Sequence, residues 1–135
     1  MHGRTEAYVR AVTIELGLSA TVSLQVSHAD TALMLKSGDV EVLGTPRVIA
    51  LAEEASCAAV AAHILAEQAT VGSEVQISHI APTPVGADVS ANAVLDSIEG
   101  RRLVFKVTVT DSRGLIAAGY ITRVLVDRAR FLEKV

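Results

Sequence analysis

Residues 44–68 read GTPRVIALAEEASCAAVAAHILAEQ, and this stretch carries the strongest helical pattern in the chain. Thr45 can cap the helix, and Pro46 suits the first turn because a proline there gives up only an N–H that would have no partner. Good helix formers continue to about Ala69, which is long enough for about six turns. Apolar residues occupy nearly every angle around this helix, which predicts burial on most of its sides.

The sequence after this helix alternates with a period of two and predicts strands. Residues 75–80 alternate first, and the prolines within residues 81–86 then break the pattern, because proline is excluded from central strands. Three longer predicted strands follow, separated by the tight-turn signals at residues 99–100 and 111–114; they are Asp88–Ile98, Arg102–Thr110 and Leu115–Asp127. Long strands joined by short turns predict an antiparallel meander.

Upstream of the helix the pattern is less regular. Ala20–His28 is predicted as a strand and residues 30–44 as irregular, while Tyr8–Leu16 fits either an extra strand or a helical turn, of which we predict the strand. We expect a single domain over residues 1–135, with residues 1–17 as an N-terminal extension. One long buried helix against one curved antiparallel sheet is an α+β fold.

The composition excludes several classes of protein. The chain has 135 residues, half of them apolar, but only four aromatic residues and a net charge of −3. A net-negative chain lacks the positive surface that binds nucleic acid. No stretch is long and apolar enough to span a membrane, and the N-terminus shows no secretory signal. The single cysteine, Cys57, fits a reducing compartment. These features predict a soluble cytoplasmic domain without nucleic-acid or membrane partners.

Glu53 is the most informative candidate for chemistry. It follows the apolar residues 49–52 and precedes Ala55, and carboxylates are rarely buried unless they are paired or functional. The adjacent Glu54 points about 100° away on a helix and suits a solvent-facing role. The structural alternative places Glu53 on a wet stripe of the helix with other charged residues.

Thr45 and His79 each allow a structural and a catalytic interpretation. A threonine at a helix start is usually a cap, although its hydroxyl also lies beside the unpaired N–H groups of the first turn. His79 shares a predicted strand face with Val75 and Ile77 and therefore points toward the helix. A histidine on an apolar face is more often a satisfied core residue than a catalytic one.

The other candidates are weaker. Cys57 is best interpreted as a small buried hydrophobic residue, and His63 has no partner at metal-ligand spacing. Arg101 and Arg102 follow a turn glycine, which predicts a solvated tip or, less strongly, a contact with phosphates. The sequence contains no motif for a bound metal or cofactor.

Two segments resemble the fluoroacetyl-CoA thioesterase family of hot-dog proteins: residues 72–86, GSEVQISHIAPTPVG, and residues 97–103, SIEGRRL. The eight-residue spacing from Thr45 to Glu53 matches as well, and the resemblance extends roughly over residues 18–135. It implies a hot-dog fold and an acyl-CoA thioesterase that hydrolyses a small or medium acyl thioester to the free acid and coenzyme A. No cofactor is implied beyond the coenzyme A of the substrate.

The resemblance also implies roles for individual residues. Its catalytic threonine, glutamate and histidine fall on Thr45, Glu53 and His79, and its acyl-positioning glycine and arginine fall on Gly72 and Arg123. The chain departs from the family in the segment between Thr31 and Thr45, which is shorter and lacks the aromatic lid residue, and in Glu54, which replaces an aromatic. Leu33 and Met34 are then the expected substrate contacts in that segment, and the acyl preference is expected to be broader or different.

Thr45 and Glu53 cannot both reach one carbonyl from a single straight helix, because eight residues separate them by about 12 Å and a rotation of roughly 80°. Either Thr45 lies in a loop that folds back, or the helix of a partner subunit supplies one of the two groups. Hot-dog domains usually pair, so we expect a homodimer, possibly a dimer of dimers, with acyl sites at its interface. Whether Glu53 attacks the carbonyl or activates water stays open.

Two other functions are compatible with a hot-dog fold. An acyl-thioester hydratase or dehydratase usually carries an aspartate–histidine pair in one loop-helix segment, and the nearest pair here, His28 with Asp30, lies on a different element. A non-catalytic acyl-CoA-binding protein would not need Thr45, Glu53 and His79 together. The joint presence of these three residues favours the thioesterase.

Overall fold

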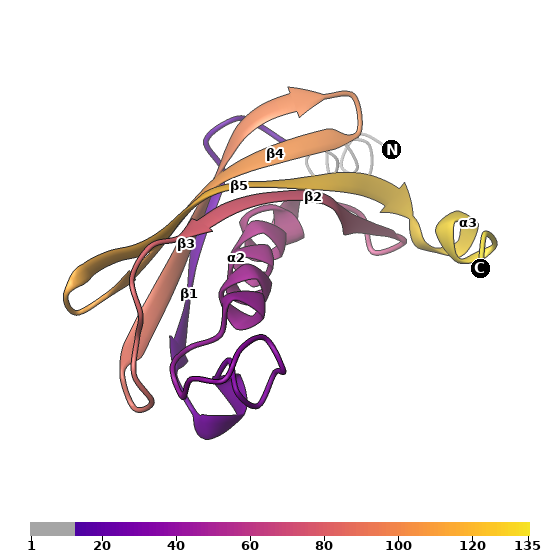
Figure 1. Ribbon diagram of the computed structural model, residues 1–135. Coiled ribbons are helices and arrows are strands. Elements are labelled where there is room, and N and C mark those ends of the chain that lie inside the picture. The colour runs from indigo at the N-terminus through magenta and orange to yellow at the C-terminus, as the bar shows by residue number, and fades with distance from the viewer. Residues whose placement is uncertain (1–12) are drawn as a thin grey trace, which may run out of the picture.

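The structure is a computed structural model that describes residues 13–135. Five antiparallel strands form one sheet in the order β1-β3-β4-β5-β2, and they comprise β1 (Ser19–Gln25), β2 (Gln68–His79), β3 (Asp88–Glu99), β4 (Arg102–Asp111) and β5 (Gly114–Asp127). The sheet curves around one long helix, α2 (Figure 1). The predicted α+β class and the meander of the last three strands are confirmed. The predicted strand at Tyr8–Leu16 lies outside the described residues up to residue 12, and residues 13–16 are not in a strand or helix.

Helix α2 spans Thr45–Val60 and continues as a single 3₁₀ turn, Ala61–His63. The prediction that it reaches Ala69 is therefore wrong. A local turn replaces the last part, in which the Leu65 N–H donates to the Gln68 side chain and the Gln68 N–H donates to the Leu65 carbonyl. Because Gln68 is already paired with Asp127 in the sheet, strand pairing outweighs the helix propensity of these residues.

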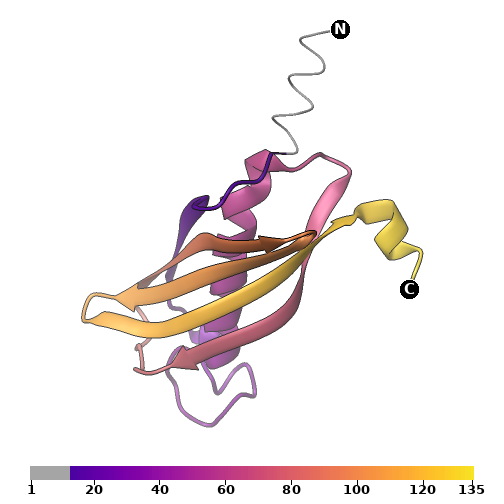
Figure 2. The same cartoon turned by 90° about the horizontal axis from the view of Figure 1, so that it is seen from above.

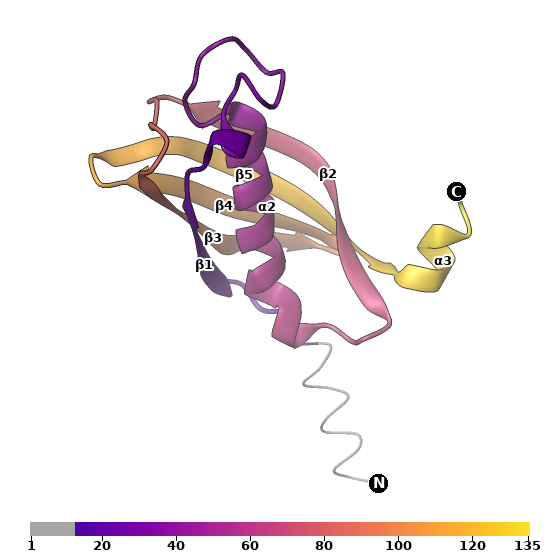
Figure 3. The same cartoon turned by 90° about the horizontal axis from the view of Figure 1, so that it is seen from below.

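Packing against the sheet buries one face of α2. The prediction that this helix is buried on most of its sides is therefore wrong. The fully buried side chains recur at helical spacing and include Val48, Leu51, Ala52, Ala55, Ser56, Ala59 and Val60. They pack against apolar residues of the sheet, among which Phe105 of β4 is the largest fully buried side chain. Figure 3 shows α2 lying on the sheet with β2 along one edge and β1 along the other.

A short C-terminal helix, α3 (Arg128–Leu132), follows β5 directly. Figure 2 shows that α3 projects beyond the end of the sheet. Its N-cap is Asp127, whose side chain accepts a hydrogen bond from the Arg130 N–H. In the part of the chain that the structure describes, no helix is both long and apolar enough to cross a membrane.

Candidate active site

Thr45 and His79 are in direct contact. The Thr45 Oγ1 and the His79 Nδ1 lie 2.8 Å apart, and either atom donates depending on the tautomer of the ring. The N-cap of α2 is Gly44, so the interpretation of Thr45 as the helix cap is wrong, and its hydroxyl is free to bind the histidine. The other ring nitrogen, His79 Nε2, is buried and has no hydrogen-bond partner among the described residues. A buried nitrogen of this kind needs a partner, which a reacting group can supply.

An ionic cluster ties the start of α2 to the η1 segment that follows β1. The Asp30 carboxylate accepts hydrogen bonds from the Ser27 N–H and hydroxyl, and its other oxygen lies 3.2 Å from the Arg47 Nε. Burial raises the pKa of Asp30, but the two hydrogen bonds from Ser27 and the charge of Arg47 outweigh it and lower this pKa below its ordinary value. The Asp30 carbonyl also accepts the Gly44 N–H, which ties this loop to the residue before Thr45.

A second cluster fixes the loop that follows His79. The Thr83 hydroxyl donates to the Asp111 carboxylate, and the Arg113 guanidinium donates to the Pro82 carbonyl. The hydrogen bond from the Arg113 N–H lowers the pKa of Asp111, and the Thr83 hydroxyl and the Arg113 side chain add to this effect against the opposing effect of burial. The two sides of the Thr45–His79 pair are therefore each anchored by a hydrogen-bonded carboxylate.

Glu53, Gly72 and Arg123 form a second group. The Arg123 Nη1 donates to the Glu53 Oε2 at 2.9 Å, while the rest of the guanidinium binds the hydroxyl and carbonyl of Thr70. A Cβ on Gly72 would lie 2.6 Å from the Glu53 Oε2, so only glycine leaves room for the carboxylate in this position. Glu54 is exposed on the helix, as predicted.

Thr70 is the residue of this group that the sequence did not indicate. It becomes recognisable only from the register of the sheet, in which Thr70 pairs with Leu125 and Gly72 with Arg123. These pairings place Thr70 two residues from Gly72 on the same face of β2, within reach of the long arginine side chain.

The two groups lie at separate places in one chain. Thr45 is the first residue of α2 and Glu53 lies within the same continuous helix, so Thr45 is not in a loop that folds back. Eight residues of helix correspond to about 12 Å, which is too far for both side chains to contact one carbonyl. In the register of β2 with β5, His79 faces Ala117 whereas Gly72 faces Arg123. The candidate residues therefore form two separate groups in each chain, which we call the first half-site (Thr45 with His79) and the second half-site (Glu53 with Arg123).

A cavity of about 380 Å³ opens beside the first half-site. Its walls combine Thr45 and His79 with the loop after η1 (His28–Asp30) and the loop after β2, and they include Ala32, Val40, Val42, Leu43, Ile80 and Pro82. Leu33 and Met34 are exposed and do not line this cavity, and their role as substrate contacts stays a prediction.

Of the weaker candidates, Cys57 lies beside the second half-site. Cys57 is half-buried with its Sγ 3.8 Å from the Thr70 hydroxyl, which fits a packing role beside Arg123. Within residues 13–135, no cluster of three or more His, Cys, Asp or Glu side chains is arranged to hold a metal ion.

Comparisons with known proteins show the family to which this chain is similar. The model of a family described as fluoroacetyl-CoA-specific thioesterase matches residues 26–129. The fluoroacetyl-CoA thioesterase of Streptantibioticus cattleyicolor is 33% identical over 95 residues, which cover 70% of this chain and 68% of that protein.

Solved structures show the same fold. A variant of fluoroacetyl-CoA thioesterase in complex with fluoroacetate superposes with a TM-score of 0.83 at 28% identity, covering 90% of this chain and 96% of the other. A hot-dog-like protein from Thermanaerovibrio acidaminovorans superposes with a TM-score of 0.82 at 21% identity, covering 90% of each chain. The predicted hot-dog fold is confirmed.

Proposed function

The chain belongs to the fluoroacetyl-CoA-specific thioesterase family and is an acyl-CoA thioesterase, and we propose that Thr45, His79 and Glu53 carry out its chemistry. The observation that carries this assignment is the 2.8 Å contact between Thr45 and His79, which leaves the buried His79 Nε2 without a partner. The Glu53 carboxylate, which accepts a hydrogen bond from Arg123, acts either as the proton acceptor or as the nucleophile.

The residues divide the hydrolysis between them. Glu53, oriented by Arg123, takes the proton of a water molecule that attacks the thioester carbon, or attacks that carbon itself and forms an anhydride that water then opens. The Thr45 hydroxyl donates to the oxygen on which negative charge develops. His79 delivers a proton to the departing thiolate, so that the products are a free acid and a thiol.

We propose that the complete site forms across a homodimer, with Thr45 and His79 from one chain and Glu53 and Arg123 from the partner. β2 is an edge strand, and Val75 within it is 42% exposed although it shares a face with Ile77, which packs on the core. An unpaired edge with an exposed apolar residue is suited to pairing with a second copy. When the α2 helices of the two subunits lie antiparallel, the Thr45 end of one helix comes close to Glu53 of the other.

The acyl group is expected to occupy the cavity beside Thr45 and His79. Its apolar walls are aliphatic, with Val40, Val42 and Leu43 among them. Aliphatic side chains do not provide the flat surface of an aromatic lid, and they fit acyl groups of several shapes. We therefore propose a broader acyl preference than that named by the family description.

The test is a thiol-release assay over acetyl-, fluoroacetyl-, butyryl- and isobutyryl-CoA, with Glu53→Gln and the matched control Glu54→Gln. We expect turnover of more than one acyl-CoA, loss of about a thousandfold or more in kcat for Glu53→Gln, and little change for Glu54→Gln. Light scattering should give twice the 14.1 kDa of one chain for each protein. Full activity in the Glu53→Gln dimer would overturn the assignment of this residue.

A further inference from the structure

The guanidinium group of Arg123 is bound mainly by one residue, Thr70. The Arg123 Nε donates to the Thr70 hydroxyl at 2.9 Å, and the Arg123 Nη2 donates to the Thr70 carbonyl at 2.7 Å. Nε and Nη2 lie on the same edge of the planar guanidinium, so the hydroxyl and the carbonyl of a single residue occupy that edge. The nitrogen that this leaves for Glu53 is Nη1.

Glu53 is therefore bound through one of its two oxygens. An arginine frequently binds a carboxylate through two parallel hydrogen bonds, one to each oxygen. Here the Arg123 Nη1 donates to the Glu53 Oε2 at 2.9 Å, and among residues 13–135 the Glu53 Oε1 accepts no hydrogen bond. The Glu53 side chain is 35% exposed, which leaves room for a water molecule or a substrate to reach it.

The burial of Arg123 makes the Thr70 hydroxyl important for this arrangement. Arg123 is 7% exposed, so its N–H groups need partners within the protein. Without the Thr70 hydroxyl, the Nε–H is left buried without an acceptor, which is unfavourable. The guanidinium then gains by turning toward the nearest remaining acceptor, the Glu53 carboxylate, and by binding both of its oxygens.

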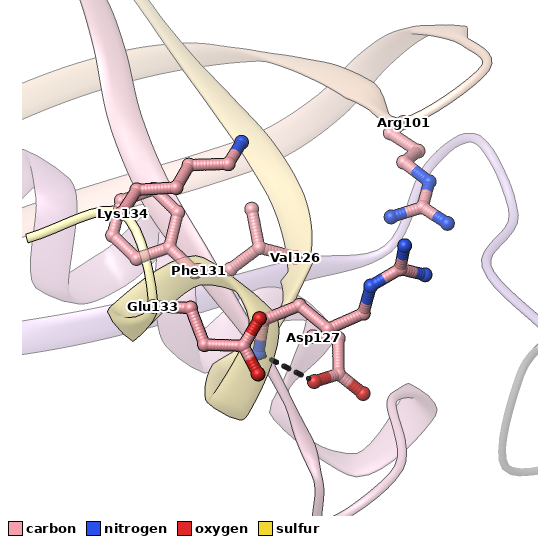
Figure 4. A pocket seen from close by; sticks show the side chains of 7 residues that line it. Arg101, Val126, Asp127, Phe131, Glu133 and Lys134 are labelled. Carbon is pink, nitrogen blue, oxygen red and sulfur yellow. Dashed lines mark hydrogen bonds between the residues drawn. The ribbon is translucent and has the colours of Figure 1, made fainter.

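The backbone around this contact is fixed independently of the Thr70 side chain. In the register of β2 with β5, Thr70 pairs with Leu125 and Gln68 pairs with Asp127. Asp127 also caps α3, and Figure 4 shows the hydrogen bond that its carboxylate accepts from the backbone of this helix. A substitution of the Thr70 side chain therefore changes the hydrogen bonds of Arg123 but not the pairing of the strands.

We propose that Thr70 is a positioning residue of the second half-site, whose hydroxyl orients the Arg123 guanidinium so that Glu53 is bound through Oε2 alone. The Glu53 Oε1 then stays available to the attacking water molecule or for direct attack on the thioester carbon. This role rests on the proposed function, because it concerns the carboxylate to which that function assigns the chemistry. Thr70 acts through Arg123 and not on the substrate itself.

The kinetic test compares Thr70→Val with Thr70→Ser and with the control Thr108→Val, which removes a hydroxyl from β4 at the position paired with Ala118. We expect Thr70→Val to lower kcat about tenfold or more and to leave KM within about twofold, because it displaces the reacting oxygen and no substrate contact. Thr70→Ser keeps the hydroxyl and should stay within about threefold of wild type. Unchanged kcat in Thr70→Val, a change confined to KM, or an equal loss in Thr70→Ser or Thr108→Val would overturn the proposal.

Nitrogen-15 NMR of the arginine Nε–H groups tests the same contact without turnover. The Arg123 signal is assigned by its absence in Arg123→Lys, and in the wild type it should exchange slowly with water, because this N–H is buried and bound to Thr70. Glu53→Gln should leave the signal protected, whereas Thr70→Val should not. Loss of protection in Glu53→Gln, or full protection in Thr70→Val, would contradict the proposal.

The two measurements separate this proposal from the activity itself. If no acyl-CoA is hydrolysed, the proposed function fails, while the NMR comparison still decides whether Thr70 or Glu53 holds the guanidinium. If Thr70→Val does not fold, the Glu53→Gln measurement alone decides it, because protection that survives the loss of the carboxylate supports Thr70 as the residue that fixes Arg123.

Discussion

Thr45 illustrates how one residue position decides between a structural and a chemical role. The residue before it, Gly44, is the N-cap, so α2 needs no hydrogen bond from the Thr45 hydroxyl. The loops on either side are held by the Asp30 and Asp111 clusters, which fix the hydroxyl against the His79 ring. The Thr45 hydroxyl is therefore not needed to cap α2, and its fixed position supports the proposed role in binding the substrate.

Thr45→Val should therefore lower activity without lowering stability. Valine keeps the shape of threonine but cannot donate to a developing oxyanion, which is expected to cost about a hundredfold in kcat. Thr45→Ser retains the hydroxyl and should stay within about tenfold of wild type. Steady-state kinetics and urea unfolding measure the two effects separately. A large loss of unfolding free energy in Thr45→Val would instead show that the hydroxyl is structural.

Gly72→Ala tests the room that Glu53 requires. The added Cβ would meet the Glu53 Oε2 at 2.6 Å and displace the carboxylate, and a displacement of about 1 Å can cost a hundredfold in rate. The strand itself should not suffer, because alanine is less flexible than glycine in a strand. Ser73→Ala, at the neighbouring position, is the control and should keep its activity. Unchanged kcat in Gly72→Ala would remove Gly72 from the site.

At the scale of elements, the first turn of α2 depends on the loop before it. The Ser27–Asp30–Arg47 cluster joins η1 to α2, and the Asp30 carbonyl accepts the Gly44 N–H. The carboxylate has its pKa lowered by these partners, so its charged form is favoured in the folded state. This contribution to stability is present above the pKa of about 3.9 in the unfolded chain and is lost as the pH falls through the lower folded value.

Asp30→Asn should show this dependence directly. At pH 7 we expect it to unfold about 1 kcal/mol more easily than wild type, since the ionic contacts are partly exposed. The difference should shrink as the pH falls below about 3.9, where Asp30 becomes protonated in the unfolded chain, and it should be lost once the pH passes the lower pKa of the folded state. Urea unfolding at several pH values measures it, with the exposed Asp39→Asn as a control that should follow wild type. A difference that stays constant down to pH 3 would exclude charge as the cause.

The elements differ in how far local sequence determines them. The meander was predictable because alternation and turn residues are local, and Asp88, Arg102 and Asp127 fall at strand ends where expected. The end of α2 was not, because residues 61–69 favour a helix locally and leave it only to pair β2 with β5. The same pairing places Thr70 beside Arg123. Because this contact depends on the register of two strands far apart in the sequence, the sequence indicated Arg123 but not its partner.

At the scale of the whole molecule, the candidate residues of each chain lie in two separate, anchored half-sites. Thr45 with His79 lies at one end of α2, and Glu53 with Arg123 lies farther along the same helix. Periodicity and helix geometry were enough to predict this separation. Which chain supplies each half depends on the pairing of two copies, and no local pattern encodes that pairing. A C₂ dimer would hold two equivalent sites, each with one half from each subunit.

Mixing two inactive variants tests this arrangement. Glu53→Gln and His79→Ala damage opposite half-sites, so a mixed dimer of composite sites contains one site with both defects and one with neither. If subunits combine at random, half of the dimers are mixed, and about a quarter of wild-type activity should return after co-refolding. The matched control mixes Glu53→Gln with Arg123→Lys, which damage the same half-site and should restore nothing. If each site were contained within one chain, every subunit of a mixed dimer would be defective. A lack of recovered activity in both mixtures would therefore place the whole site in a single subunit.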